Sequence, residues 1–447
     1  MGWLGGLLLA GNLIGTAVQN AKTKKEIQTI YQQVADTNYD NRMVMALPGI
    51  DTKQLLLTSG DNDDNDILVY EYTGTTPAIN YIWGENSSPE GLVTSGANQS
   101  ARVRAMMPFV RKSQIEEIPV IALHSGNVEL ETMITENSRC CECINKNKLY
   151  YDVFRGMPVD DMATLLYETM PEDDASPNAE ALFRALLEVV LRTNGTVTFQ
   201  NLAAFPISDI SVKLNSMLSS GEITADEHRE IDGFYKSGSS ELNAVRVFLN
   251  KLNRQAEGIY GRPTSNVCNI KKMLNLKGAI AIDVGASGND LFFSLAMNHI
   301  MLLQSQGREF SIILDGIPIS RFPKATDLLR GRTYAISHND FVSSLSGGEI
   351  KGDDLFTEIC GNVQTLVLLK HSSNTSCQKW SDHLGTYHKY KIKYNISQSN
   401  AMINSNTSRG IQVDEADEPR VRAQTLEKLI GDMACIHSAE GTLFAEV

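Results

Sequence analysis

The chain has 447 residues and a formal net charge of -13 at pH 7, a length that accommodates one large α/β domain with inserted or flanking subdomains. The acidic balance argues against a broad, sequence-independent nucleic-acid surface, because phosphate binding depends largely on Lys and Arg. Seven cysteines without regular spacing exclude a disulfide framework and indicate a reducing compartment.

The N-terminal run from Gly2 to Val18 (GWLGGLLLAGNLIGTAV) is apolar and is followed by three lysines. At about 17 residues it lies at the lower limit for spanning a bilayer. No positive charge precedes it, so it lacks the pattern of a secretory signal peptide. Two interpretations stay open: a helix packed against the protein itself or a partner, and a segment that contacts the membrane. In the second case the lysines predict a cytoplasmic chain attached to the inner face of the membrane.

Residues 22 to 90 are predicted to form a small β-rich domain. A helix is expected near Lys22 to Val34, and the hydrophobic alternation from residue 42 onward is typical of short strands. The acidic turn Asp61 to Asp66 resembles the start of a calcium loop, but it lacks the glycine at the sixth position and the acidic residue at the twelfth. We interpret it as a solvated hairpin turn.

The stretch from Gly91 to Gly126 predicts a strand, a small-residue turn, an amphipathic helix and a second strand at Pro119 to Leu123. This order is the opening βαβ unit of a nucleotide-binding α/β domain. In a P-loop, the pattern G-x-x-x-x-G-K-[ST] wraps the phosphates with backbone amides, places a lysine on them and gives Mg²⁺ a hydroxyl ligand.

The corresponding residues, Gly96 to Val103 (GANQSARV), keep only the first glycine of that pattern. Ala101 stands at the second glycine, Arg102 at the lysine and Val103 at the hydroxyl residue. A planar guanidinium is poorly suited to the point-charge role of the lysine. Two interpretations are open: an ancestral ATPase converted to a structural part, and an ordinary βαβ turn that never bound a nucleotide.

Three cysteines cluster in Cys140-Cys141-Glu142-Cys143. A structural zinc site needs four converging ligands, and neither a second pair of cysteines nor a nearby histidine completes the set. We therefore predict no metal site, and we interpret the thiols as lying in or beside a buried strand.

From Val159 to about Ala256 the chain is predicted to be helical. Apolar residues recur at amphipathic spacing in four segments, which are Met162 to Tyr167, Ala179 to Leu191, Ile210 to Leu218 and Leu242 to Leu252. Ser176-Pro177 is a helix start, and Thr224 followed by Glu227 has the spacing of a capping box.

Strands and helices then alternate again, which indicates one α/β core interrupted by a helical insertion. The predicted strands are Gly278 to Asp283, Phe310 to Asp315, Thr333 to Ile336 and Val363 to Lys370, with a helix at Asn289 to Leu303. An ATPase of this type needs an acidic residue at the end of a buried strand to hold Mg²⁺, and a neighbouring glutamate to orient water. Asp315 supplies the first, and Gly316 stands where the glutamate belongs.

The C-terminal part begins with a lysine-rich strand, Tyr387 to Tyr394, in which Lys389, Lys391 and Lys393 share one face. Such a strand can bind single-stranded nucleic acid, or its lysines can block edge-to-edge pairing. Polar residues Asn395 to Gly410 predict a loop, and Ala423 to Asp432 is expected to close the chain with a helix.

Over about residues 90 to 447 this pattern resembles the type IV coupling proteins of conjugation and type IV secretion, the TraG/TraD group of the FtsK/HerA-like motor ATPases. The strand PVIALHSG, from Pro119, is similar to the strand after the family's P-loop helix, which usually ends in Asp-x-Lys-Gly, and His124 takes the aspartate's place. Tyr151 to Phe154 resembles the entry into the family's all-α domain. Ser337 stands at the sensor glutamine, and Ser381 to Gly385 resembles the C-terminal part of the motor fold.

The resemblance implies a RecA-like P-loop core with an inserted all-helical domain and a small β-rich N-terminal domain. The expected parts are residues 1–21 (apolar segment), 22–90 (β-rich domain), 91–157 (first part of the core), 158–262 (helical insertion) and 263–447 (rest of the core with C-terminal strands and helix). It also implies hexameric rings that move DNA or protein substrates to a membrane channel, with Arg330 or Arg332 as a trans-acting arginine finger.

The leading expectation is a catalytically inactive relative that acts as a scaffold subunit of a membrane-associated secretion or conjugation complex, assembled with copies of itself or with related motor subunits. No catalytic residue and no cofactor is expected, and the degenerate nucleotide site would comprise Gly96, Asn98, Ser100, Arg102 and Asp315. The first alternative is a weak motor that uses ATP and Mg²⁺ at those residues. The second is a nucleic-acid-binding module without nucleotide, which uses Lys389, Lys391 and Lys393.

Overall fold

The computed structural model describes residues 24–42, 91–145, 149–260, 267–285, 290–322, 324–330, 333–346, 351–401, 404–439 and 441–447. The chain forms two compact units. Unit 1 comprises Met1–Gly84, Ser95–Asn98 and Gln364–Val447, and unit 2 comprises Glu85–Thr94 and Gln99–Val363. The predicted apolar run Gly2 to Val18, the predicted strands between residues 42 and 90 and the acidic turn at Asp61 lie outside the described residues.

Unit 2 is built on a sheet whose strands follow the order β1-β8-β7-β2-β6-β3. Their bounds are β1 Gly91–Ser95, β2 Val120–His124, β3 Cys141–Ile144, β6 Ala279–Asp283, β7 Ser311–Asp315 and β8 Tyr334–His338. The strands β3, β6, β2, β7 and β8 pair in parallel. Apolar runs such as Val120 to Leu123 are fully buried, as expected for a sheet covered on both faces.

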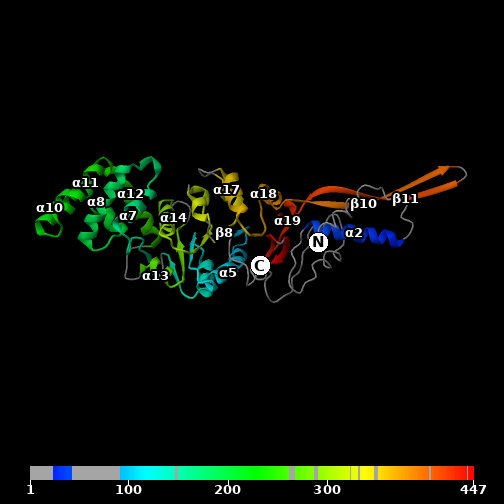
Figure 1. Ribbon diagram of the computed structural model, residues 1–447, viewed down its shortest axis with the longest axis horizontal. Coiled ribbons are helices and arrows are strands. Elements are labelled where there is room, and N and C mark those ends of the chain that lie inside the picture. The colour runs from blue at the N-terminus through cyan, green and yellow to red at the C-terminus, as the bar shows by residue number, and fades with distance from the viewer. Residues whose placement is uncertain are drawn as a thin grey trace. The chain divides into compact units, whose positions relative to one another are not determined.

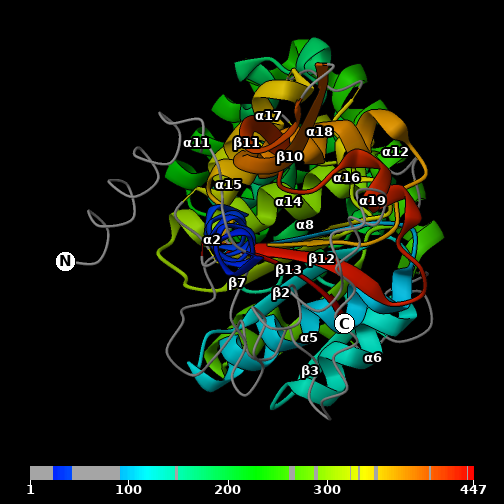
Figure 2. The ribbon, with the colours of Figure 1, turned by 90° about the vertical axis from the view of Figure 1, so that its right-hand side faces the viewer.

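Helices cover both faces of this sheet (Figure 2). On one side lie α5 (Gln99–Ile115) and α6 (Val128–Asn137), and on the other lie α14 (Asp290–Ser305), α15 (Ala325–Leu329) and α17 (Gly352–Gly361). The remaining short helices of this part are α13 (Ile270–Asn275) and α16 (Phe341–Ser344). This layering confirms the predicted α/β class.

The register of the parallel strands aligns three polar residues at their carboxyl ends. His124 of β2 lies opposite Asp283 of β6 and opposite Asp315 of β7. Ligands of open α/β sheets bind outside this edge, so this is where a site is to be sought.

The chain between β3 and β6 is mainly helical (green in Figure 1). It contains α7 Val159–Thr169, α8 Pro177–Asn194, α9 Phe199–Ala204, α10 Ile210–Ser220, α11 Ala225–Gly238 and α12 Leu242–Tyr260, flanked by the short strands β4 Tyr150–Tyr151 and β5 Val267–Cys268. The predicted local signals are present: Pro177 is the first residue of α8, and Thr224 with Glu227 forms a capping box at the start of α11.

Buried polar contacts attach the helical segment to the sheet part of unit 2. Asn298 of α14 donates from Nδ2 to the carbonyl oxygen of Glu168 at 2.9 Å, and Tyr151 hydrogen-bonds to Nδ1 of His299. Burial lowers the pKa of His299 to about 3, so this imidazole is neutral at physiological pH. Such contacts hold α7 against α14 in a defined register.

Lys277 has a left-handed backbone, with φ of 57°, in the turn that joins α13 to β6. Its side chain is exposed, and only glycine adopts this conformation without steric cost. We expect Lys277→Gly to raise the free energy of unfolding by about 0.5–1 kcal/mol, measured by urea denaturation. The matched control is Lys272→Gly within α13, where glycine should destabilise the protein by about 1 kcal/mol. Stabilisation by both substitutions, or by neither, would contradict the conformational explanation.

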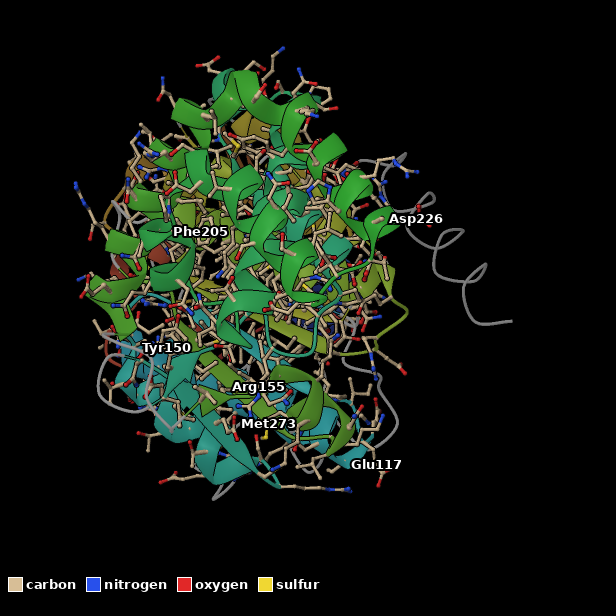
Figure 3. All side chains as sticks on the ribbon, turned by 90° about the vertical axis from the view of Figure 1, so that its left-hand side faces the viewer. Glu117, Tyr150, Arg155, Phe205, Asp226 and Met273 are labelled. Carbon is tan, nitrogen blue, oxygen red and sulfur yellow. The ribbon has the colours of Figure 1, made fainter. Side chains whose placement is uncertain are left out.

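A second residue with a left-handed backbone is Glu117, labelled in Figure 3, which has a φ of 59°.

Unit 1 contains an antiparallel sheet and a long hairpin. The sheet has the order β13-β12-β9, with β9 Thr365–Leu368, β12 Met433–Ser438 and β13 Gly441–Glu446. The hairpin pairs β10 Thr386–Ala401 with β11 Asn404–Pro419. The described helices of this unit are α2 Lys24–Arg42, α18 Asn374–Leu384 and α19 Ala423–Lys428.

Two expectations for the C-terminal part were wrong. The predicted loop Asn395 to Gly410 is mostly strand, because a two-stranded ladder is held by backbone hydrogen bonds and does not require apolar alternation. The helix predicted to end the chain is shorter and is followed by β12 and β13. Within the described residues, no helix has the length and hydropathy required to cross a bilayer.

Candidate functional site

The turn that corresponds to the P-loop is short. Strand β1 ends at Ser95 and α5 begins at Gln99, so only Gly96, Ala97 and Asn98 separate them. Gly96 has φ of +140°, and a Cβ on it would lie 2.5 Å from Cβ of Leu369. The backbone conformation and the close approach to Leu369 therefore explain the glycine without a phosphate.

Hydrogen bonds within each unit use the polar groups of this turn. In unit 1 the N–H of Ala97 donates to the carbonyl of Lys370 at 3.1 Å, and Asn98 donates to the carboxylate of Asp432 at 2.9 Å. In unit 2 the hydroxyl of Ser100 donates to the carboxylate of Glu129 at 2.9 Å. One backbone amide and two side chains of this region thus donate to protein acceptors, whereas a P-loop directs its backbone amides at phosphate oxygens.

Arg102, at the position of the P-loop lysine, is buried in unit 2. Its side chain is 6% exposed, and its Nε donates to the hydroxyl of Ser337 at 3.1 Å. Burial lowers the pKa of Arg102, and attraction to the carboxylate of Asp315 raises it in part. Arg102 therefore supplies the positive charge beside Asp315.

Asp315 ends β7 and is 3% exposed. Its Oδ2 accepts a hydrogen bond of 2.7 Å from Nδ2 of Asn127, whereas its Oδ1 has no hydrogen-bond partner among the described residues. Asn127 also caps helix α6, because its Oδ1 accepts from the N–H of Leu130 at 3.1 Å and from Gln99 at 2.9 Å. One amide side chain thus joins the starts of α5 and α6 to the carboxylate.

His124, at the position of the family's aspartate, belongs to a second buried polar group. Its Nδ1 accepts from the N–H of Asn127 at 3.0 Å, which places the imidazole proton on Nε2. That nitrogen lies 3.4 Å from Oε1 of Glu131, and both side chains are at most 2% exposed. Asn145 donates to the same carboxylate oxygen at 2.7 Å. His124 and Glu131 therefore lie close together in the buried interior, and Nε2 of His124 has no hydrogen-bond partner among the described residues.

These residues do not fit a Mg²⁺-nucleotide in the P-loop manner. Only three residues separate β1 from α5, and Val103, which is 2% exposed, has no side-chain oxygen for the metal. Gly316 has φ of 67°, a conformation in which a glutamate would be strained. Among the described residues of the site, Oδ1 of Asp315 and Nε2 of His124 are both buried without a hydrogen-bond partner, and the carboxylate oxygen is an atom that could bind a cation.

The two proposed arginine fingers stay predictions. Arg330 is 70% exposed and forms ion pairs with Asp327 at 3.3 Å and Glu358 at 3.4 Å. Arg332 lies outside the described residues. Exposed pairs such as those of Arg330 contribute little to stability.

The predicted nucleic-acid strand is β10, and two of its lysines contact one carboxylate. In unit 1 Glu418 lies 3.6 Å from Nζ of Lys389, 2.6 Å from Nζ of Lys391 and 2.9 Å from Arg422. The side chain of Lys393 is outside the described part of the strand. Asn38 of α2 covers the strand edge, since it both donates to the carbonyl and accepts from the N–H of Tyr390.

The carboxylate of Glu418 makes the stability of the hairpin depend on pH. Burial raises the pKa of Glu418, but hydrogen bonds from Lys391 and Arg422 outweigh it and lower the pKa to about 2. A carboxyl whose folded pKa is depressed stabilises the fold above its unfolded pKa of about 4.3, and this contribution is lost as pH falls toward 2. We expect Glu418→Gln to cost about 1 kcal/mol at pH 7, after allowance for solvent screening, and nothing near pH 2. Urea denaturation across this pH range measures the difference; a cost independent of pH would contradict the ion-pair explanation.

Several residues of the site were not predicted. They are Gln99, Asn127, Glu131 and His338. Asn127 had a usable signal, because an Asn directly before an apolar helical run is a frequent N-cap. His338 had no such signal. Burial and the charge of Arg102 lower the pKa of His338, and Arg102 lies far from it in the sequence.

No protein-family profile matches the sequence, and no protein of established function is a significant sequence relative. Solved structures of a bacterial conjugative coupling protein do match. The unbound form of TrwBdeltaN70 has a TM-score of 0.52 at 14% identity, over 81% of this chain and 86% of that chain. TrwB in complex with a non-hydrolysable ATP analogue has a TM-score of 0.51 at 12% identity, over 85% and 92%. TrwB in complex with ADP and Mg²⁺ has a TM-score of 0.50 at 14% identity, over 80% and 84%.

At identities of 12–14%, these structural matches show the fold alone. The chain has a mixed α/β architecture with a large parallel sheet that matches the RecA-like coupling protein TrwB, as the sequence pattern predicted. The nucleotide complexes describe TrwB, and the site residues of the present chain differ from a working P-loop as set out above.

Proposed function

Because the chain has the fold of the conjugative coupling protein TrwB, we propose that it is a non-hydrolysing relative of the coupling ATPases. It acts as a structural subunit of a conjugation or secretion complex at the cytoplasmic face of a membrane, assembled with copies of itself or with related motor subunits. The observation that carries the proposal is the buried Arg102, which is bonded to Ser337 and attracted to Asp315.

Arg102 supports this proposal through charge. In a motor ATPase the acidic residue after the strand faces Mg²⁺ and the lysine faces phosphate, so both depend on a nucleotide for their partners. Here the positive charge of Arg102 attracts the carboxylate of Asp315, and the side-chain amide of Asn127 donates a hydrogen bond to it. The site is thereby closer to electrical balance without a nucleotide, and a nucleotide-bound cation would have to compete with the hydrogen bond from Asn127.

Calorimetric titration of the full chain with ATP, with and without Mg²⁺, tests the proposal. We expect no binding heat and no phosphate release in a turnover assay. The matched variant is Asp315→Ala, which should behave in the same way. ATP binding that Asp315→Ala abolishes, or turnover that depends on Arg102, would overturn the proposal.

The second candidate is a weak ATP-dependent motor, and the free Oδ1 of Asp315 favours it. A buried carboxylate oxygen without a partner is uncommon in folded proteins. Under this alternative the Oδ1 atom would face Mg²⁺, and binding of ATP in the titration above would require the metal.

A third candidate, nucleic-acid binding through Lys389, Lys391 and Lys393, has weaker support, because Glu418 lies against two of these lysines. Binding to single-stranded DNA measured across a salt series tests it, with Lys391→Glu as the variant. Salt-dependent binding that the variant removes would establish this function in place of the first.

A further inference from the structure

Cys141 and Cys143 on β3 turn their sulfur atoms toward one another. Residues i and i+2 of a strand share one face and lie about 6.5–7 Å apart along the strand. The two Sγ atoms are nevertheless only 3.9 Å apart. Cys141 is half-buried and Cys143 is 7% exposed, so the pair is a convergent dithiol that is reached from the side of Cys141.

The polar neighbours of this dithiol are Thr135 on α6 and Glu142 on β3. The hydroxyl of Thr135 on α6 donates to the carbonyl of Glu131 at 2.7 Å and lies 3.7 Å from Sγ of Cys143. Since its proton is already donated, the hydroxyl oxygen accepts from the Cys143 thiol. Glu142 points to the opposite face of the strand, where it bonds to Cys268; burial and this carboxylate raise the pKa of Cys268.

The geometry suits a metal ion better than a disulfide. A disulfide requires a sulfur–sulfur bond of about 2.05 Å, so the two sulfur atoms would have to move closer from 3.9 Å while the Cα atoms, held by pairing with β6, stay near the upper limit of about 6.8 Å that disulfides tolerate. With metal–sulfur bonds of about 2.3 Å, a separation of 3.9 Å corresponds to a sulfur–metal–sulfur angle of about 116°. This angle lies near trigonal and tetrahedral values, so an ion can bind without moving the strand.

We infer that Cys141 and Cys143 form a two-thiolate site for a thiophilic metal ion, of which Cu(I) is the clearest representative. On binding, two S–H bonds break, two metal–sulfur bonds form and two protons are released, without any change of oxidation state. Among the described residues, no group of three or more His, Cys, Asp and Glu side chains converges. The remaining coordination therefore comes from water or a small thiol, and the site differs from a closed structural zinc site.

Competition for Cu(I) between the full chain and a chromophoric Cu(I) chelator, under reducing conditions, tests this inference. We expect one ion per chain, and a loss of affinity of about a hundredfold or more in Cys141→Ser and in Cys143→Ser, because removal of a ligand exceeds the effect of outer-shell changes. Bound Cu(I) should also protect Cys141 from alkylation.

Cys140→Ser is the matched control, because it removes a neighbouring thiol from a different environment. Its Sγ lies over Gly278, where a Cβ would approach it to 2.5 Å. Affinity should be unchanged in this variant. Equal loss in all three variants, or no binding above that of the double variant Cys141→Ser/Cys143→Ser, would overturn the inference. Circular dichroism verifies that each variant is folded, and the alkylation readout remains available if Cys143→Ser is not.

Discussion

Arg102→Met is expected to lower the free energy of unfolding by about 2 kcal/mol, because Ser337 loses its hydrogen bond from a charged donor and the buried carboxylate of Asp315 loses a nearby positive charge. Methionine keeps most of the side-chain volume, so the loss reports charge more than packing. Urea denaturation followed by circular dichroism measures the change. If Arg102 instead awaited a nucleotide, its removal would relieve strain and leave stability unchanged or higher.

Two further variants separate charge from other effects of the substitution. The double variant Arg102→Met/Asp315→Asn also removes the buried negative charge and should recover about 1 kcal/mol, since no carboxylate is then left without a nearby positive charge. Arg111→Met on the same helix is the matched control, because Arg111 is exposed and bonds only to Asn137 among the described residues. Equal losses in Arg102→Met and Arg111→Met would contradict a specific role for the buried charge of Arg102.

Asn127→Ala is expected to lower the free energy of unfolding by about 3 kcal/mol. The loss of the α6 N-cap contributes about 1 kcal/mol, and the remainder comes from the buried carboxylate of Asp315, which loses its hydrogen bond of 2.7 Å. Thermal and urea denaturation measure the change.

Asn127→Ser is the matched control for this second prediction. Serine can still cap α6 but has no amide to donate to Asp315, so we expect a loss of about 2 kcal/mol. The difference between the two variants isolates the cap. If the serine variant were as stable as the natural chain, the hydrogen bond between Asn127 and Asp315 would not contribute to stability.

Local signals in the sequence were sufficient for much of unit 2. The capping box at Thr224 and the proline at the start of α8 act within one helical turn, so they could be recognised without a partner segment. The buried strands that end at His124 and Asp315 were likewise evident as continuous apolar runs. The hairpin β10–β11 was missed in part, because its polar outer half is held by a backbone ladder that leaves no hydrophobic pattern.

By itself, the sequence determined that this chain has an α/β core with a long helical segment, and it predicted that Arg102, Val103 and Gly316 stand at the positions of three groups that a P-loop ATPase requires. Only the tertiary structure decided what the substituted residues do. Arg102 meets Ser337, 235 positions further along the chain, and Asp315 meets Asn127 across 188 positions. These contacts depend on the register of parallel strands, which brings distant carboxyl ends together and is not encoded in any local pattern.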